Sequence, residues 1–110
     1  SEILTGYFTK YVDGGSDFLP LGGLLKTKVC RLAEELGVPE RIISKPPSAG
    51  LWPGQTDEAD LGMSYNQLDD ILLRLERGQK QIQNPRLVAR VRSYLKASRH
   101  KRILPPICKI

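Results

Sequence analysis

Three short segments of this 110-residue chain combine charges, hydroxyls and flexible backbone in ways that suit a phosphate-bearing or polyhydroxyl ligand. The first joins Thr9 and Lys10 to the run Asp-Gly-Gly-Ser-Asp over 13–17, which brings a cation and two carboxylates to one turn. The second is Lys26, predicted in the first turn of a helix, where an ammonium and free backbone amides can meet a phosphate. The third is Lys-Pro-Pro-Ser over 45–48. Taken singly, each segment is more typical of a solvated surface turn than of a site, since Lys and Asp are mostly exposed.

Most of the elements that must position these segments are predicted to be helices. The start of the chain reads as a helix end that runs into a loop at Gly6. Apolar spacing predicts a helix over 25–36, with Gly37 after its end, and Pro39 begins a short helix over 39–44. A capping box over 64–67 and the pair Asn84-Pro85 begin two more helices. The predicted apolar stripes are Leu25, Val29, Leu32, Ala33 and Leu36; Leu68, Ile71, Leu72 and Leu75; and Leu87, Val88, Val91 and Leu95.

Two other segments have weaker patterns. Phe18–Leu21 predicts a short strand, and a strand followed by a glycine turn and a helix is typical of an α/β layer. One strand makes no sheet, so we expect the sheet to lie outside this sequence. Residues 45–63 contain three prolines and three glycines without a period, and they exceed the roughly 12–15 residues of ordinary loops. They are interpreted as a lid or binding loop.

Charge is divided unevenly along the chain. Residues 1–76 hold seven Lys or Arg and all twelve Asp or Glu, whereas 77–110 hold ten Lys or Arg and no acid. Such a basic segment favours a polyanion, which leaves open nucleic acid, an acidic membrane, a phosphate-rich ligand, or the acidic half of the same protein. A nucleic-acid-binding helical module would need stacking aromatics, and the last helix offers only Tyr94.

Cysteine usage and hydropathy narrow the class of protein. Cys30 and Cys108 form no C-x-x-C pair, and the chain has one histidine, so we do not expect a zinc site assembled from this segment alone. No apolar run approaches the roughly 18 residues of a membrane helix, and no leader is evident. We therefore expect a soluble, cytoplasmic protein.

Several motifs together resemble one enzyme family. They are Gly-Tyr-Phe-Thr-Lys-Tyr over 6–11, Asp-Gly-Gly-Ser-Asp over 13–17, Lys-Pro-Pro-Ser-Ala-Gly-Leu over 45–51, Gly-Gln-Thr-Asp-Glu over 54–58, Leu-Gly-Met-Ser-Tyr over 61–65 and His-Lys-Arg over 100–102. In this order and spacing the chain resembles ammonia-dependent NAD synthetase over essentially its whole length.

The resemblance implies a doubly wound, Rossmann-like α/β fold in the intact family, with this segment mostly helical and holding one or two short strands. It implies a homodimer that uses ATP and Mg²⁺ to adenylate deamido-NAD, after which ammonia displaces AMP to give NAD. Its partners are small-molecule substrates, with no nucleic acid and no membrane. The family's Ser-Gly-Gly-x-Asp-Ser nucleotide loop is absent from 1–110, so these residues are expected to be the C-terminal portion of one domain and inactive alone. Within it, 45–63 is the lid and 84–110 the last helix and basic tail.

Site residues follow from the resemblance position by position, and none is assigned as a separate catalytic group. Glu2 matches the magnesium ligand, and Lys26 and Ser48 match ATP-binding positions. The positions that contact deamido-NAD are matched by Lys10, Asp17, His100 and Lys101.

Three positions depart from the family's usual pattern. Val12 stands where Gly is usual, Gly50 where Asp is common, and Ser48 where Thr is more frequent. A truncated paralogue acting as a binding or regulatory subunit is a further possibility, which the full reading frame decides.

Overall fold

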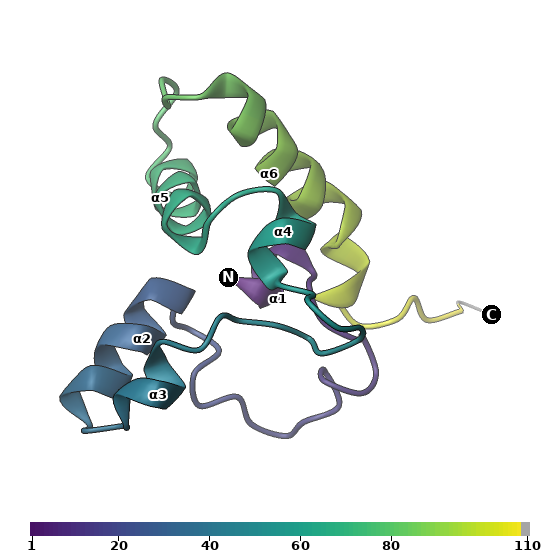
Figure 1. The fold of residues 1–110 in the computed structure, drawn as a ribbon. Coiled ribbons are helices and arrows are strands. Elements are labelled where there is room, and N and C mark those ends of the chain that lie inside the picture. The colour runs from purple at the N-terminus through teal and green to yellow at the C-terminus, as the bar shows by residue number, and fades with distance from the viewer. Residues whose placement is uncertain (109–110) are drawn as a thin grey trace.

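The computed structural model describes residues 1–108, and every regular element within them is helical (Figure 1). In chain order the elements are α1 (Glu2–Thr5), α2 (Lys26–Glu35), α3 (Glu40–Ile43), α4 (Asp57–Leu61), α5 (Tyr65–Glu76), α6 (Pro85–Ala97) and the 3₁₀ helix η1 (Arg99–Lys101). The prediction of a mostly helical segment is confirmed. The prediction of one or two short strands is wrong for the part of the chain that is described.

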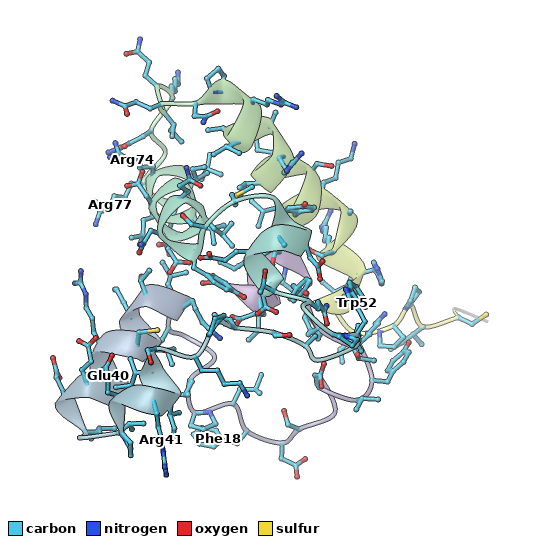
Figure 2. The ribbon with its side chains drawn as sticks, viewed as in Figure 1. Phe18, Glu40, Arg41, Trp52, Arg74 and Arg77 are labelled. Carbon is cyan, nitrogen blue, oxygen red and sulfur yellow. The ribbon has the colours of Figure 1, made fainter. Side chains whose placement is uncertain are left out.

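The segment predicted as a strand is a series of turns. Two of its carbonyls accept locally, because the Gly22 N–H donates to the Leu19 carbonyl at 3.0 Å and the Leu24 N–H donates to the Leu21 carbonyl at 2.9 Å. Phe18 is 78% exposed and lies on the long loop between α1 and α2 (Figure 2). Because residues 1–108 contain no neighbouring strand to donate to these carbonyls, turns satisfy them instead.

The core lies between α4, α5 and α6. It consists of the buried residues Leu61, Met63, Tyr65, Leu68, Ile71, Leu72 and Val91. The predicted starting points of α5 and α6 are confirmed. Ser64 and Gln67 form the reciprocal capping box, and the Asn84 side chain accepts from the Leu87 N–H. Local side-chain capping therefore defines where both core helices begin.

Two local predictions need correction. Pro39 is the N-cap residue of α3 and not its first helical residue. The loop predicted over 45–63 contains α4, which Thr56 caps by accepting from the Ala59 N–H and which ends at Gly62 in the left-handed conformation. A helix of five residues is too short to show a 3.6-residue period, so its apolar spacing gave no signal.

The N-terminal helix α1 lies near the centre of the molecule and contacts α6 (Figure 1). The basic tail holds its C-terminal end: Arg102 donates to the carbonyl of Leu4 at 2.6 Å, and Lys101 donates to the carbonyls of Gly6 and Phe8 at 2.6 and 2.7 Å. These cations satisfy the carbonyls that a helix end leaves without partners. Hydrogen bonds thus join the first residues of the chain to residues 101 and 102.

The helix α2 begins without a cap from its own N-cap residue, Leu25. Its first donors are bound by other segments instead: the Lys26 N–H donates to the Ser1 hydroxyl at 2.8 Å, and the Thr27 N–H donates to Asp69 of α5 at 2.8 Å. The Ser1 hydroxyl in turn donates to the same carboxylate. Asp69, which is buried, therefore links α1, α2 and α5.

The amphipathic stripe predicted over 25–36 is only partly covered. None of the α2 residues is fully buried, and Leu36 is exposed. Within residues 1–108 no helix is long and apolar enough to cross a membrane.

Candidate active site

An ion pair joins α1 to α2 at the centre of the site. The Lys26 ammonium lies 2.9 Å from Oε1 of Glu2, and both side chains are about one-third exposed. Arg102 of the tail binds the end of α1, and Asp69 binds the start of α2, so the backbone that carries Glu2 and the backbone that carries Lys26 are both fixed by hydrogen bonds. Burial disfavours the charged Glu2 carboxylate, but the hydrogen bond and the charge of Lys26 outweigh it and hold the pKa of Glu2 below its usual range.

Tyr65 lies beneath this ion pair. Its hydroxyl is 2.9 Å from Oδ2 of Asp57 and 3.3 Å from Oε1 of Glu2, and its ring centroid lies 5.4 Å from the Lys26 ammonium. The side chain is 5% exposed. Burial, the nearby Glu2 charge and the hydrogen bond to Asp57 all raise the pKa of Tyr65, so the phenol stays neutral.

A cavity of about 510 Å³ opens beside these groups. Glu2, Lys26 and Asp57 contribute to its lining, together with Lys45 and Ser48 from the segment before α4. The structure thus brings three predicted site residues (Glu2, Lys26 and Ser48) to one cavity. Two ammonium groups and a hydroxyl suit phosphate oxygens, while the Glu2 carboxylate suits a cation.

A second cavity, of about 520 Å³, lies between the Gly-Tyr-Phe-Thr-Lys motif and the long loop. Tyr7 donates to Asp60 at 2.6 Å, and Gln55 donates to Asp60 at 2.8 Å and to the Tyr7 oxygen at 3.2 Å. The hydrogen bond to Asp60 raises the pKa of Tyr7 to about 12, while the donors Gln55 and Tyr7 lower the pKa of Asp60. Residues 45–63 are therefore connected to the motif through this Tyr7–Gln55–Asp60 cluster.

The predicted deamido-NAD residues are not gathered in one place. Lys101 lines the second cavity, and its ammonium is already bonded to two carbonyls. The Lys10 ammonium lies 5.2 Å from the ring centroid of Tyr11. Asp17 and His100 are exposed, on the α1–α2 loop and on η1. Their assignment to a substrate stays a prediction.

Residues 1–108 contain no group of three acidic, histidine or cysteine side chains that would hold a metal ion by itself. Glu2 still fits as one ligand of Mg²⁺, because this ion is commonly held by one or two carboxylates together with substrate phosphates. The cavity beside Glu2 is lined by the cations and hydroxyl that would receive those phosphates. Both Cys30 and Cys108 are free cysteines.

The sequence pattern indicated no role for Asp57, Tyr65 or Asp69. Asp57 and Tyr65 belong to motifs that were recognised, but nothing in their local pattern shows that they meet Glu2. The helix α4 could have been predicted from the sequence, because it has an N-cap threonine (Thr56), acidic residues in its first turn and a glycine after its last residue.

Residues 1–105 match the family described as NAD synthase, and the chain belongs to this family. It is 54% identical over its whole length to the NH(3)-dependent NAD(+) synthetase of Archaeoglobus fulgidus, covering 44% of that protein. Over 96% of its length it is 54% identical to the enzyme of the same name from Pyrococcus horikoshii, again covering 44%. The chain therefore spans less than half of these relatives.

A solved structure, that of NMN synthetase from Francisella tularensis, matches 99% of this chain and 43% of its own. The TM-score is 0.85 and the sequence identity 41%. The described helices thus correspond to a mostly helical portion of an α/β protein.

Proposed function

We propose that this chain is part of an ATP-dependent ligase that amidates deamido-NAD with ammonia to give NAD, AMP and pyrophosphate. A carboxylate oxygen of the substrate bonds to the α-phosphorus of ATP as pyrophosphate leaves. Ammonia then bonds to the carbonyl carbon of the adenylate, and AMP leaves with the electron pair of the broken C–O bond. The observation that carries the proposal is the Glu2–Lys26 ion pair in one cavity with Ser48, in a chain of this family.

The residues of the first cavity take the ATP roles. Lys26 and Ser48 bind phosphate oxygens, and the Lys26 ammonium stabilises the negative charge that develops when the α-phosphate is attacked. Glu2 would hold Mg²⁺, which supplies neutralising charge to the phosphates when bound. Lys10, Asp17, His100 and Lys101 are assigned to deamido-NAD by their match to the family's positions.

The whole-protein properties are proposals as well. We infer a homodimer, the cytoplasm as the site of action, and residues 1–110 as the C-terminal portion of a single domain in which 45–63 closes over the substrates. The Tyr7–Gln55–Asp60 cluster supports such a lid, because three polar side chains at its edge are a small contact to break and remake.

The basic tail has an intramolecular role that supports a small-molecule function over nucleic-acid binding. Lys101 and Arg102 bind carbonyls at the end of α1, and Arg90 donates to the carbonyl of Gly62 at 3.3 Å. Lys101 and Arg102 thus support α1, which carries Glu2, and Arg90 supports the end of α4.

The test uses a full-length family protein that carries this chain, supplied with ATP, Mg²⁺, ammonium and deamido-NAD. AMP and NAD are expected in equal amounts, and neither should form when deamido-NAD is omitted. A parallel reaction with nicotinate mononucleotide tests whether the protein follows the Francisella relative and makes NMN. Amidation of the mononucleotide alone would overturn the dinucleotide assignment, and absence of AMP in both reactions would overturn the proposed function.

A further inference from the structure

The hydroxyl of Tyr65 stands between two carboxylates and has only one proton to donate. The distance to Asp57 Oδ2, 2.9 Å, is that of an ordinary hydrogen bond, whereas the distance to Glu2 Oε1, 3.3 Å, is long for an O–H donor. The proton therefore lies with Asp57. Glu2 is left with the Lys26 ammonium at 2.9 Å as its closer side-chain partner.

The position of Asp57 favours it over Glu2 as the acceptor of the Tyr65 hydroxyl proton. It is 6% exposed, and its backbone N–H donates to the carbonyl of Pro47 at 2.9 Å, which places the residue at the start of α4. Within residues 1–108 the Tyr65 hydroxyl is the one donor to its side chain, because Oδ1 is buried without a partner. A buried carboxylate with a single donor binds that donor strongly, since the alternative is an unpaired charge.

We propose that Asp57 is a positioning residue that keeps the Tyr65 proton away from Glu2, so that a divalent cation competes for the Glu2 carboxylate with the Lys26 ammonium and not also with the phenol. This inference rests on the proposed function for the identity of the cation. Asp57 acts through Tyr65 and touches neither the ion nor the phosphates in this role. The buried, otherwise unpartnered carboxylate then has a reason to be present beside an ion pair to which it contributes no bond.

Replacement of Asp57 by asparagine changes the competition for the proton. The side-chain shape is kept, but a neutral amide oxygen is a weaker acceptor than an ionised carboxylate. The Tyr65 hydroxyl would turn toward Glu2 and stabilise its negative charge in place of the cation. Because this effect needs the hydroxyl, Asp57→Asn should have little effect on cation binding once Tyr65 is phenylalanine.

The experiment measures Mn²⁺ binding with ATP, without the nicotinate substrate, in a full-length family protein carrying this chain. Water-proton relaxation reports the bound ion, so no turnover is required. Asp57→Asn is expected to raise the dissociation constant about tenfold, the effect of one charge-assisted hydrogen bond. Tyr65→Phe and the double variant are expected to stay within about threefold of the unmodified protein, although the buried Asp57 charge makes Tyr65→Phe less stable. Asp70→Asn, an exposed change on α5, is the matched control.

Rescue of Asp57→Asn by Tyr65→Phe is the result that supports the proposal. Equal loss of binding in Asp57→Asn and in the double variant would overturn it, because Asp57 would then act without Tyr65. A loss of about tenfold in Tyr65→Phe alone would overturn it too, and this variant can be measured even if Asp57→Asn does not fold. AMP formation by the unmodified protein is recorded separately, so failure of the proposed function is distinguishable from failure of this inference.

Discussion

Asp69 on α5 accepts two hydrogen bonds from Thr27 on α2, one from its backbone N–H and one from its hydroxyl, each 2.8 Å long. The two residues are 42 positions apart in the chain. A side chain from another helix thus takes the place of the missing cap on α2. This contact determines where Lys26, the adjacent residue, stands in the site.

Asp69→Ala should therefore destabilise the protein by about 3 kcal/mol, because it leaves the buried Ser1 hydroxyl and the partly buried donors of Thr27 without their acceptor. Asp69→Asn should cost less, since one oxygen remains. Urea unfolding measures both. Asp70→Ala, which removes an exposed pair with Arg74, should change stability by no more than about 0.5 kcal/mol. Similar losses at the two neighbouring aspartates would contradict the capping role.

Gly6→Ala should destabilise more than Gly37→Ala. Both glycines have positive φ, +75° and +72°, so each substitution costs about 1 kcal/mol in backbone strain. At Gly6 a new Cβ would also lie 2.2 Å from Cβ of Ser98, whereas at Gly37 it would meet nothing within 4 Å. Thermal unfolding compares the two variants. The added change Ser98→Gly should recover part of the loss at Gly6 and none at Gly37.

Arg102→Lys should loosen α1 although it keeps the positive charge. The guanidinium donates to carbonyls of Leu4 and Leu95 at 2.6 and 2.7 Å, and a lysine ammonium cannot span both directions. Exchange of the Thr5 and Tyr7 amide protons should accelerate about tenfold. Arg99→Lys, an exposed change on η1, serves as the control. Unchanged exchange in Arg102→Lys would mean that α1 is held by other contacts.

The contact between residues 45–63 and the Gly-Tyr-Phe-Thr-Lys motif should be stable only in the pH range in which the Tyr7–Asp60 hydrogen bond forms. The pKa of Asp60 is lowered by folding, so its contribution is present above about 3.9, the unfolded value, and is lost as pH falls through the lower folded pKa. The pKa of Tyr7 is raised to about 12, so its contribution is present below the unfolded value and is lost as pH rises through 12. Trp52, on the same loop, offers a fluorescence signal (Figure 2).

Asp60→Asn tests the cause of the Tyr7 shift. Removal of the carboxylate should bring the pKa of Tyr7 down toward its ordinary value of about 10. The tyrosinate absorbance that Tyr7→Phe abolishes identifies this group among the four tyrosines. A titration near 12 that persists in Asp60→Asn would assign the shift to burial instead.

Lys26→Ala and Lys10→Ala should differ in kinetics in a full-length family protein carrying this chain. Lys26→Ala should lower kcat by about 100-fold, because its ammonium matters most as charge develops on phosphate. Lys10→Ala should mainly raise KM for deamido-NAD. Lys28→Ala, exposed on the same helix as Lys26, should change neither. Identical behaviour of the first two variants would contradict the division into two sites.

Short-range interactions made much of the fold predictable. The capping box of Ser64 and Gln67, the N-cap of Asn84 and the left-handed glycines Gly6 and Gly37 after α1 and α2 all act within a few residues, and a sequence displays them directly. The prediction of a strand over Phe18–Leu21 was wrong because a strand depends on long-range interactions. A strand needs a neighbour to bond, and none lies within the described residues.

The sequence by itself determined the longer helices α2, α5 and α6, the family motifs and the residues that reach the first cavity (Glu2, Lys26 and Ser48). Tertiary structure alone decided what supports them: Asp69 against Thr27, Arg102 against Leu4, and Tyr65 between Asp57 and Glu2. Helix caps bind donors three residues away, so local pattern reports them. A buried carboxylate accepts whichever donor the packing of distant helices brings within about 3 Å, and no spacing along the chain records that distance.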